Sequence, residues 1–408
     1  MQDQLPTLTT GQRIKLYRLR AGKTRAVLGG LVGRSAEWVK SVEMGRILPP
    51  RIQMLNQIAR ALKVPVQALI AEHDQAIMAA GAGHAALPAV REALNRWPVH
   101  DDAEPRSLDR IAARLGVAWR ARHAAPDHRT VIGALLPNLI RDAQSAALAH
   151  QGAQQRQAKA LLADALGLSQ MFLAYQPAAD LLWRVADRAV VASRESGDPV
   201  AMAQAIWFAA EAHRDAGDWD TAMAINQDGI AAMERELDEP GRGEPSDAML
   251  GMYGALHAAA AFTAARAGES GHAWRYWDKA DEIVRRLPND YYHRVTSFSR
   301  PVMIAHAVTL EVELRKGDKA VHTASRTQAE QIRSRPRRAR HLIEVARGHH
   351  QQNEHEATLN LLASAYETAP ETIRYNLYAR QMVADLLDGP STLRRDANEL
   401  AIKVGLSA

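Results

Sequence analysis

The residues with the clearest capacity for chemistry are basic, and they lie at the start of the chain. Residues 1–72 contain twelve lysines and arginines against four acidic residues, a net charge of +8, whereas the remainder holds 39 basic and 42 acidic groups. Cations concentrated in one small module neutralise phosphates, so this distribution is typical of a nucleic-acid-binding protein. An anionic membrane is the alternative partner, but no uninterrupted apolar stretch approaches the length of a membrane-spanning helix.

The spacing of residues 10–70 predicts short helices joined by tight turns. Thr24 and Ser35 are suited to cap the N-termini of two successive helices, and Gly33 permits a sharp turn between them. Gly45 favours the end of the second of these helices. Apolar residues at helical spacing predict the buried face. These residues are Leu28, Leu31, Val32, Val39 and Val42.

This skeleton resembles the helix-turn-helix domain of the Cro/phage-repressor (XRE) family. The match runs from Thr10 to Ile70 and rests on residues distributed along its whole length. They include Ile14, Leu19, Thr24, Leu28, Gly33, Ser35, Val39, Val42, Gly45, Pro50, Leu55 and Pro65. The resemblance implies a five-helix DNA-binding domain over residues 1–73.

In that family the outward face of the third helix enters the major groove and reads base edges. The resemblance therefore implies contacts with double-stranded DNA at Arg25, Arg34, Ser35, Ala36, Glu37, Lys40, Ser41, Arg46 and Arg51. The arginines suit phosphates, Glu37 could accept from a cytosine amino group, and Lys40 could bind guanine or phosphate. For each single residue, an ordinary solvated helix face is the alternative interpretation.

The rest of the chain is predicted to be helical, which gives an all-α fold. Residues 74–106 contain glycines and prolines around a weak helical patch, so they predict a linker or docking segment. Residues 107–408 show alanine and leucine at helical spacing. Five junctions, at 174–179, 216–222, 267–273, 316–319 and 352–357, resemble the turns of tetratricopeptide repeats. We expect a TPR-like superhelix, with a helical bundle lacking repeats as the alternative.

This combination resembles regulators of the same family that carry a C-terminal sensor domain, many of which respond to peptides. It implies a homodimer on a palindromic operator and a peptide or small-molecule effector. Candidate effector-binding residues are those that face inward in such repeats. They are Trp207, Glu211, Arg214, Phe262, Arg266, Glu311, Arg315 and His349.

Other classes of chemistry find little support in the sequence. Cysteine is absent, which excludes disulfides, thiolate metal sites and cysteine nucleophiles and is consistent with a cytoplasmic location. No phosphate-binding loop or nucleophile elbow is present, and the histidines near residue 350 lack metal-ligand spacing, so we expect no cofactor, metal or catalysis. The basic run at 333–340 is predicted to be a solvated loop before a helix, with a contact to DNA or to an acidic partner as the alternative. A repeat scaffold with incidental DNA binding, and an enzyme with an unrecognised site, remain as alternatives.

Overall fold

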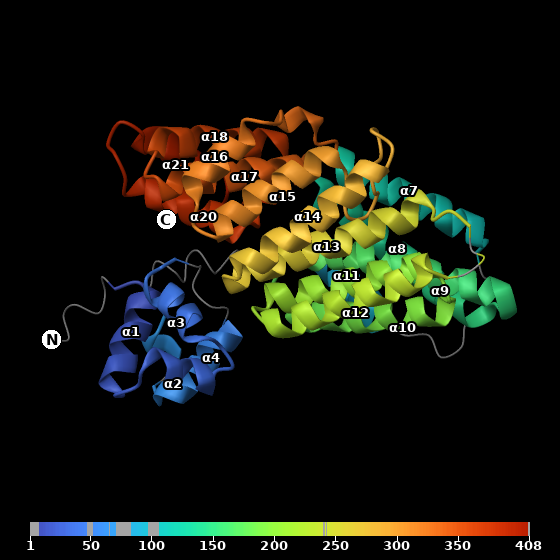
Figure 1. The fold of residues 1–408 in the computed structure, drawn as a ribbon, viewed down its shortest axis with the longest axis horizontal. Helices are drawn as coiled ribbons and strands as arrows, with labels where there is room; N and C mark the ends of the chain where they lie inside the picture. Colours follow the sequence, from blue (N-terminus) through green and yellow to red (C-terminus); the bar gives the residue numbers. More distant parts are fainter. Residues whose placement is uncertain are drawn as a thin grey trace.

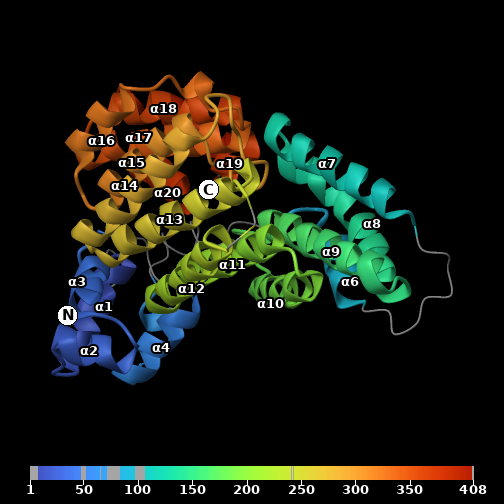
Figure 2. The same ribbon diagram turned by 45° about the vertical axis from the view of Figure 1, so that its right-hand side comes forward.

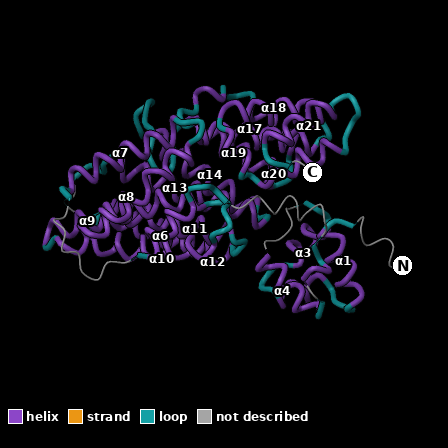
Figure 3. The backbone as a smooth tube through the Cα atoms, turned by 180° about the vertical axis from the view of Figure 1, so that it is seen from behind, coloured by secondary structure: helices purple, strands orange, loops and turns teal. Residues whose placement is uncertain are grey.

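The computed structural model describes residues 8–46, 52–64, 66–70, 83–96, 106–239, 241 and 243–406. All regular elements within these ranges are helices, as the sequence predicts. A small N-terminal domain lies beside a long helical domain (Figure 1), and the tube in Figure 3 shows helices joined by short loops throughout the described part.

The N-terminal domain consists of four described α-helices and one 3₁₀ turn. These are α1 (Thr10–Arg20), α2 (Arg25–Leu31), α3 (Ala36–Glu43), α4 (Ile52–Leu62) and η2 (Val66–Ala68). Thr24 and Ser35 cap α2 and α3 by accepting hydrogen bonds from the backbone, as predicted. Gly33 and Gly45 adopt left-handed conformations that end these helices. The order of elements expected from the sequence is therefore present in this domain.

The core of the N-terminal domain is formed by residues from all four α-helices. It contains Ile14, Leu28, Val32, Trp38, Val39, Val42, Leu55, Ile58, Ala59, Leu62 and Leu69. The prediction that Leu31 faces inward is wrong, because its side chain lies at the end of α2 on the solvent side and is 58% exposed.

Two adjacent glycines in α2 have opposite surroundings. A Cβ atom at Gly29 would lie 2.4 Å from the carbonyl oxygen of Arg34, so this glycine lets α2 approach the turn that precedes α3. A Cβ atom at Gly30 would meet nothing within 4 Å. Only Gly29 is therefore required by packing, and Gly30 costs helix stability without a compensating contact.

We expect Gly30→Ala to stabilise the N-terminal domain by up to about 1 kcal/mol, because alanine restricts the unfolded chain and favours helix. Gly29→Ala should destabilise it by about 1–3 kcal/mol through overpacking. Amide hydrogen exchange of α2 and α3 in the full chain measures both effects. Equal effects of the two substitutions would contradict this assignment.

The helical domain contains the remaining described elements. Its α-helices are α6 (Leu87–Asn95), α7 (Leu108–Ala124), α8 (His128–Ala149), α9 (Gly152–Leu173), α10 (Ala179–Ser196), α11 (Pro199–Asp215), α12 (Trp219–Leu237), α13 (Asp247–Ala267), α14 (Ser270–Arg286), α15 (Arg300–Glu313), α16 (Gly317–Ala324), α17 (Arg335–Gln351), α18 (His355–Thr368), α19 (Pro370–Arg374), α20 (Leu377–Leu387) and α21 (Arg394–Lys403). A 3₁₀ turn, η3 (Ala329–Gln331), precedes α17.

Consecutive helices of this domain pack as antiparallel pairs. The pairs α9–α10, α11–α12, α13–α14, α15–α16 and α17–α18 each meet across one of the five junctions predicted from the sequence. Each junction contains, or directly follows, one residue with a left-handed backbone. These residues are Tyr175, Gly217, Gly268, Arg315 and Asn353. The same turn geometry thus recurs five times, as a repeat architecture requires.

Small buried residues follow four of these turns at the same position. Ala222, Ala273, Ala320 and Thr358 each lie four residues after the helix N-cap and are fully buried. Their size allows the two helices of each pair to cross closely. The weak self-similarity in the sequence therefore reflects a repeated packing requirement.

Helix α6 packs against α8 and α10 and contributes Leu87, Val90 and Leu94 to the main core. It lies in the segment that the sequence predicts to be a linker or docking segment. Residues 71–82 and 97–105 on either side of it lie outside the described residues.

Helix α13 is the most enclosed helix of the domain. By length and composition it could cross a membrane, but 89% of its most apolar window is buried inside the protein. It packs against α11, α12, α14 and α15, and Figure 2 shows it running from the N-terminal domain into the body of the superhelix. We therefore assign it as a core helix.

Candidate functional site

The outward face of α3 is open to solvent and carries both signs of charge. The side chain of Glu37 is 63% exposed, and those of Lys40 and Arg46 are 38% and 40% exposed. Lys40 Nζ lies 3.2 Å from one carboxylate oxygen of Glu37, and Arg46 Nη1 lies 3.6 Å from the other. Exposed ion pairs of this kind are weak, so both cations are available to a phosphate or a base.

Three further predicted DNA-binding residues have distinct surroundings. The hydroxyl of Ser35 accepts a hydrogen bond from the backbone of Trp38 at 3.1 Å and thereby caps α3. Ala36 is exposed in the first turn of α3, and Ser41 is partly exposed one turn later. Arg51 lies outside the described residues. The structure thus brings Ala36, Glu37, Lys40 and Ser41 together on one face, as the sequence predicts.

Arg25 belongs to a buried ionic cluster that the sequence analysis missed. Glu43, at the end of α3, is 3% exposed and pairs with Arg18 from α1 and with Arg25 Nε at 2.8 Å. Burial would raise the pKa of Glu43, but hydrogen bonds from Arg18 and Arg25 outweigh this and lower it. The cluster joins α1, α2 and α3. The signal was present, because Glu43 follows Val39 and Val42 on the buried face of α3.

Arg34 faces the helical domain rather than open solvent. Its guanidinium stacks on Trp38 at 5.8 Å and is attracted by Asp218 and Asp220 at the start of α12, while burial lowers its pKa. The neighbouring Trp219 packs against the core of the N-terminal domain. These contacts connect the turn before α3 to the α11–α12 repeat.

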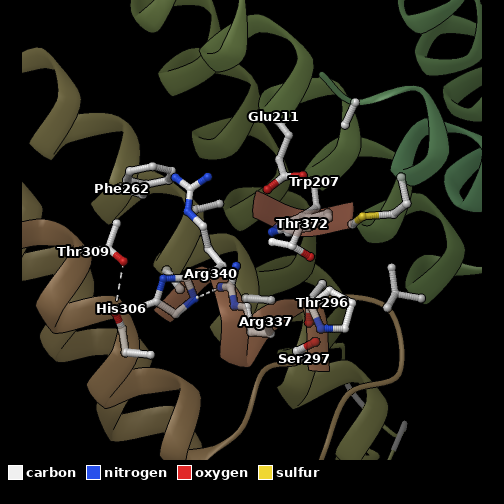
Figure 4. A pocket seen from close by; sticks show the side chains of 18 of the residues that line it. Trp207, Glu211, Phe262, Thr296, Ser297, His306, Thr309, Arg337, Arg340 and Thr372 are labelled. Carbon is white, nitrogen blue, oxygen red and sulfur yellow. Dashed lines mark hydrogen bonds between the residues drawn. The ribbon is translucent and has the colours of Figure 1, made fainter. Parts of the chain in front are cut away.

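The concave side of the superhelix encloses a cavity of about 190 Å³, which we call the inner cavity. It is lined by α11, α13, α15 and α17, together with the ends of α7, α8 and α9 and the segment 295–298. Figure 4 shows Trp207 and Glu211 opposite Arg337 and Arg340, with Phe262 at one side. Four predicted effector-binding residues line this cavity: Trp207, Glu211, Arg214 and Phe262.

A second cavity of about 120 Å³, which we call the junction cavity, adjoins the first. The two share lining residues, among them Tyr175, Arg214 and Phe262. The junction cavity is also lined by Arg34 and Trp38 of the N-terminal domain and by Met54, Trp219, Arg266 and Tyr378. A continuous set of residues therefore connects the inner cavity to the N-terminal domain.

Carboxylates pair with the arginines around the junction cavity, where Asp215 lies 3.9 Å from Arg266. Glu313 pairs with Arg347 at 3.0 Å and lies 4.0 Å from Arg266, and Glu344 pairs with Arg340 at 2.6 Å. Burial would raise the pKa of Glu313, but these cations outweigh it and lower the pKa to about 2. This network fixes α13, α15 and α17 relative to one another.

The other three predicted effector-binding residues lie outside the lining of both cavities. Glu311 is buried on α15, where burial raises its pKa. Arg315 is exposed in the turn between α15 and α16. His349 pairs with Glu354 in the turn after α17. The structure therefore separates these three residues from the five that line a cavity.

The sequence analysis missed the arginines that dominate the inner cavity. The run at 333–340, predicted to be a solvated loop, instead forms the start of α17, which Ser334 caps. Arg337 and Arg340 from this run line the cavity, together with Arg122 and Arg129 from α7 and α8. The prediction of a solvated loop was wrong because the sequence does not show which helix faces line the concave side.

The described geometry of residues 8–70 agrees with a comparison against family models. Residues 10–72 match the model of a helix-turn-helix domain. The chain carries an N-terminal helix-turn-helix domain. Its α2 and α3 are the two helices of the motif, and Gly33 lies in the turn between them. The helix-turn-helix domain is followed by a longer segment whose described regular elements are all helices.

Further comparisons add little to this assignment. The comparison with curated proteins gives no match. Among solved structures, the crystal structure of Bacillus thuringiensis PlcR in complex with the peptide PapR7 and DNA is similar at 13% sequence identity, covering 68% of this chain and 95% of that one. The TM-score is 0.28, which is too low to carry an argument about arrangement or function.

Glu43→Gln should destabilise the helix-turn-helix domain by about 3 kcal/mol at neutral pH, because Arg18 is then buried without its counter-charge. Since the pKa of Glu43 is lowered in the folded state, its contribution is complete above its unfolded pKa of about 4 and is lost as the pH falls further. The difference between variant and wild type should therefore shrink below about pH 4.

Hydrogen exchange of α1 and α3 amides at several pH values measures this effect. Glu37→Gln is the matched control, because it removes an exposed carboxylate whose pairs contribute about 1 kcal/mol or less. Equal effects of the two substitutions would contradict the role assigned to the buried cluster.

Proposed function

We propose that the protein is a sequence-specific DNA-binding transcriptional regulator whose helical domain senses a ligand. The observation that carries this proposal is the open face of α3, with Glu37, Lys40 and Ser41, in a domain that matches the helix-turn-helix model. The net charge of +8 over residues 1–72 supports it, because phosphate neutralisation supplies much of the affinity for DNA. The protein then acts in the cytoplasm by binding rather than catalysis.

The DNA contacts divide into two kinds. Ala36, Glu37, Lys40 and Ser41 read bases in the major groove, and Arg46 contacts phosphates beside it. Arg25 supports this surface through Glu43 and remains partly exposed, so it can also reach a phosphate. Two copies of the chain associate through the helical domain and place their α3 helices about 34 Å apart, or a multiple of that distance, on a palindromic operator.

The effector is a peptide or a small molecule in the inner cavity. Because the junction cavity shares residues with the inner cavity and also touches Arg34 and Trp38, an occupant can favour one placement of the helix-turn-helix domain over another. Such a population shift changes whether two α3 helices match the operator spacing.

Selection of genomic DNA fragments by the purified full-length chain tests the DNA-binding role. We expect enrichment of an inverted repeat, and we expect Lys40→Ala/Ser41→Ala to lose this enrichment because both side chains leave the groove-facing surface. The double variant Lys319→Ala/Ser325→Ala is the control, since it makes the same two changes at exposed positions of the helical domain.

An unchanged enriched sequence in the Lys40/Ser41 variant would contradict the assignment of α3 as the reading helix. Absence of enrichment with every chain, together with capture of a stable protein partner, would favour the interaction scaffold instead. The affinity of a true operator should fall steeply as salt concentration rises.

The contact between the two domains has its own test. Trp219→Ala removes the side chain that packs against the core of the helix-turn-helix domain, so we expect that domain to separate from the superhelix. Small-angle scattering should show a larger radius of gyration at unchanged helix content. Trp219→Phe keeps most of the apolar contact and should leave the radius near that of the wild type; equal radii for all three chains would show that Trp219 does not hold the domains together.

A further inference from the structure

The inner cavity gathers more positive charge than its carboxylates balance. Its lining includes the arginines Arg122, Arg129, Arg214, Arg337 and Arg340. Two of these have carboxylate partners, since Arg214 lies 2.9 Å from Glu211 and Arg340 lies 2.6 Å from Glu344. Asp215, the other carboxylate in the lining, lies 3.9 Å from Arg266. No carboxylate of the described residues lies within ion-pair distance of the other three guanidinium groups, although Glu371 attracts Arg129 and Glu211 attracts Arg337 from further away.

The hydrogen-bond partners of these three guanidinium groups are neutral. Arg122 donates to the sulfur of Met171 at 3.5 Å, Arg129 donates to the carbonyl oxygen of Phe172 at 2.6 Å, and Arg337 lies 2.7 Å from Nε2 of His306. Within the described part of the chain, Nε and Nη1 of Arg122 and Nε of Arg129 are buried with no partner at all. The hydrogen-bonding capacity of these two arginines is therefore not fully used within the described part of the protein.

Burial makes this concentration of positive charge costly. It lowers the pKa of Arg122 to about 10 and also lowers the pKa values of Arg129 and Arg337. The histidines that line the cavity are neutral at pH 7, because burial lowers the pKa of His128 to about 2 and that of His341 to about 4. Buried cations without counter-charge destabilise a protein, and an anion that entered the cavity would relieve that cost.

The size and walls of the cavity restrict the ligand further. Its volume of about 190 Å³ lies below the roughly 300 Å³ at which pockets for drug-sized ligands begin. A peptide of several residues exceeds this space, whereas a compact molecule fits. Trp207 and Phe262 supply aromatic surface beside the arginines (Figure 4). The carbon atoms of a ligand can pack against these rings while its charged groups face the arginines.

We propose that the inner cavity binds a compact molecule with at least two negative charges, carried by carboxylate or phosphate groups. Arg122, Arg129 and Arg337 hold the anionic groups, and Trp207 packs against the remainder. This identification of the ligand class rests on the sensing role proposed above and selects a small molecule over a peptide as its effector.

Titration calorimetry of the full chain with citrate, with pyrophosphate and with neutral succinamide, at constant ionic strength, tests the proposal. We expect saturable binding of citrate or pyrophosphate and no binding of succinamide; which anion binds more tightly distinguishes carboxylate from phosphate recognition. Arg122→Gln and Arg337→Gln should each weaken binding by about tenfold or more, because each removes a charged donor. Arg285→Gln is the control, since the side chain of Arg285 is 74% exposed on α14.

A second measurement separates ligand binding from a structural role. Because Arg122 is buried without an ion pair, Arg122→Gln should leave the melting temperature of the ligand-free chain unchanged or higher. A lower melting temperature would indicate that Arg122 stabilises the fold, and the proposal would then fail for this residue. The proposal would be overturned if neither citrate nor pyrophosphate bound at millimolar concentration. It would also be overturned if the anion that binds had the same affinity for the wild type and for Arg122→Gln.

The two proposals fail in distinguishable ways, because DNA selection uses no anion and the titration uses no DNA. Enrichment of an operator without anion binding would support the DNA-binding role and exclude this class of ligand. Anion binding without an enriched operator would support the inner cavity as a ligand site and exclude the DNA-binding role.

Discussion

In both domains of this protein, the free-energy cost of burying a charged side chain determines where charged side chains must pair. In the helix-turn-helix domain, Glu43 is almost completely buried, and two arginines from other helices compensate it. In the superhelix, three carboxylates compensate three arginines around the junction cavity: Asp215, Glu313 and Glu344 pair with Arg266, Arg347 and Arg340. The inner cavity departs from this rule at Arg122, Arg129 and Arg337. A departure of this kind is typical of a binding site, since structural charges are paired within the fold.

The superhelix achieves its close packing through small residues rather than through a strong apolar stripe. Ala222, Ala273 and Ala320 are fully buried at equivalent positions, and a glycine or another residue with a left-handed backbone ends the first helix of each pair. Arg315 and Asn353 show that the turn geometry is retained where glycine is absent. The backbone arrangement is therefore more regular than the residues that produce it, which is why the repeat was only weakly visible in the sequence.

Local features could be predicted from the sequence, whereas features that depend on distant contacts could not. Thr24, Ser35 and Gly33 determine helix ends through their own backbone and side-chain geometry, so the helix-turn-helix was recognisable without a structure. The orientation of Arg34 towards α12 and the burial of Arg337 depend on segments far away in the chain. His123 and Ser334, which are 211 residues apart, are hydrogen-bonded at 2.8 Å near the start of α17. No pattern within one helix indicates which of its faces meets such a partner.

Helix α13 touches both cavities along its length. Its Ala255, Ala258 and Ala259 line the inner cavity, Phe262 lines both cavities, and Arg266 lines the junction cavity. Alanine has no side-chain torsion that could absorb a displacement by changing rotamer, and the surrounding core leaves the helix little room to bend. The 21 residues of this helix span about 31 Å, so it reaches from one cavity to the other as a single stiff element. The alanine content of α13, which at first indicates only tight packing, also leaves this helix few ways to deform between the two cavities that it lines.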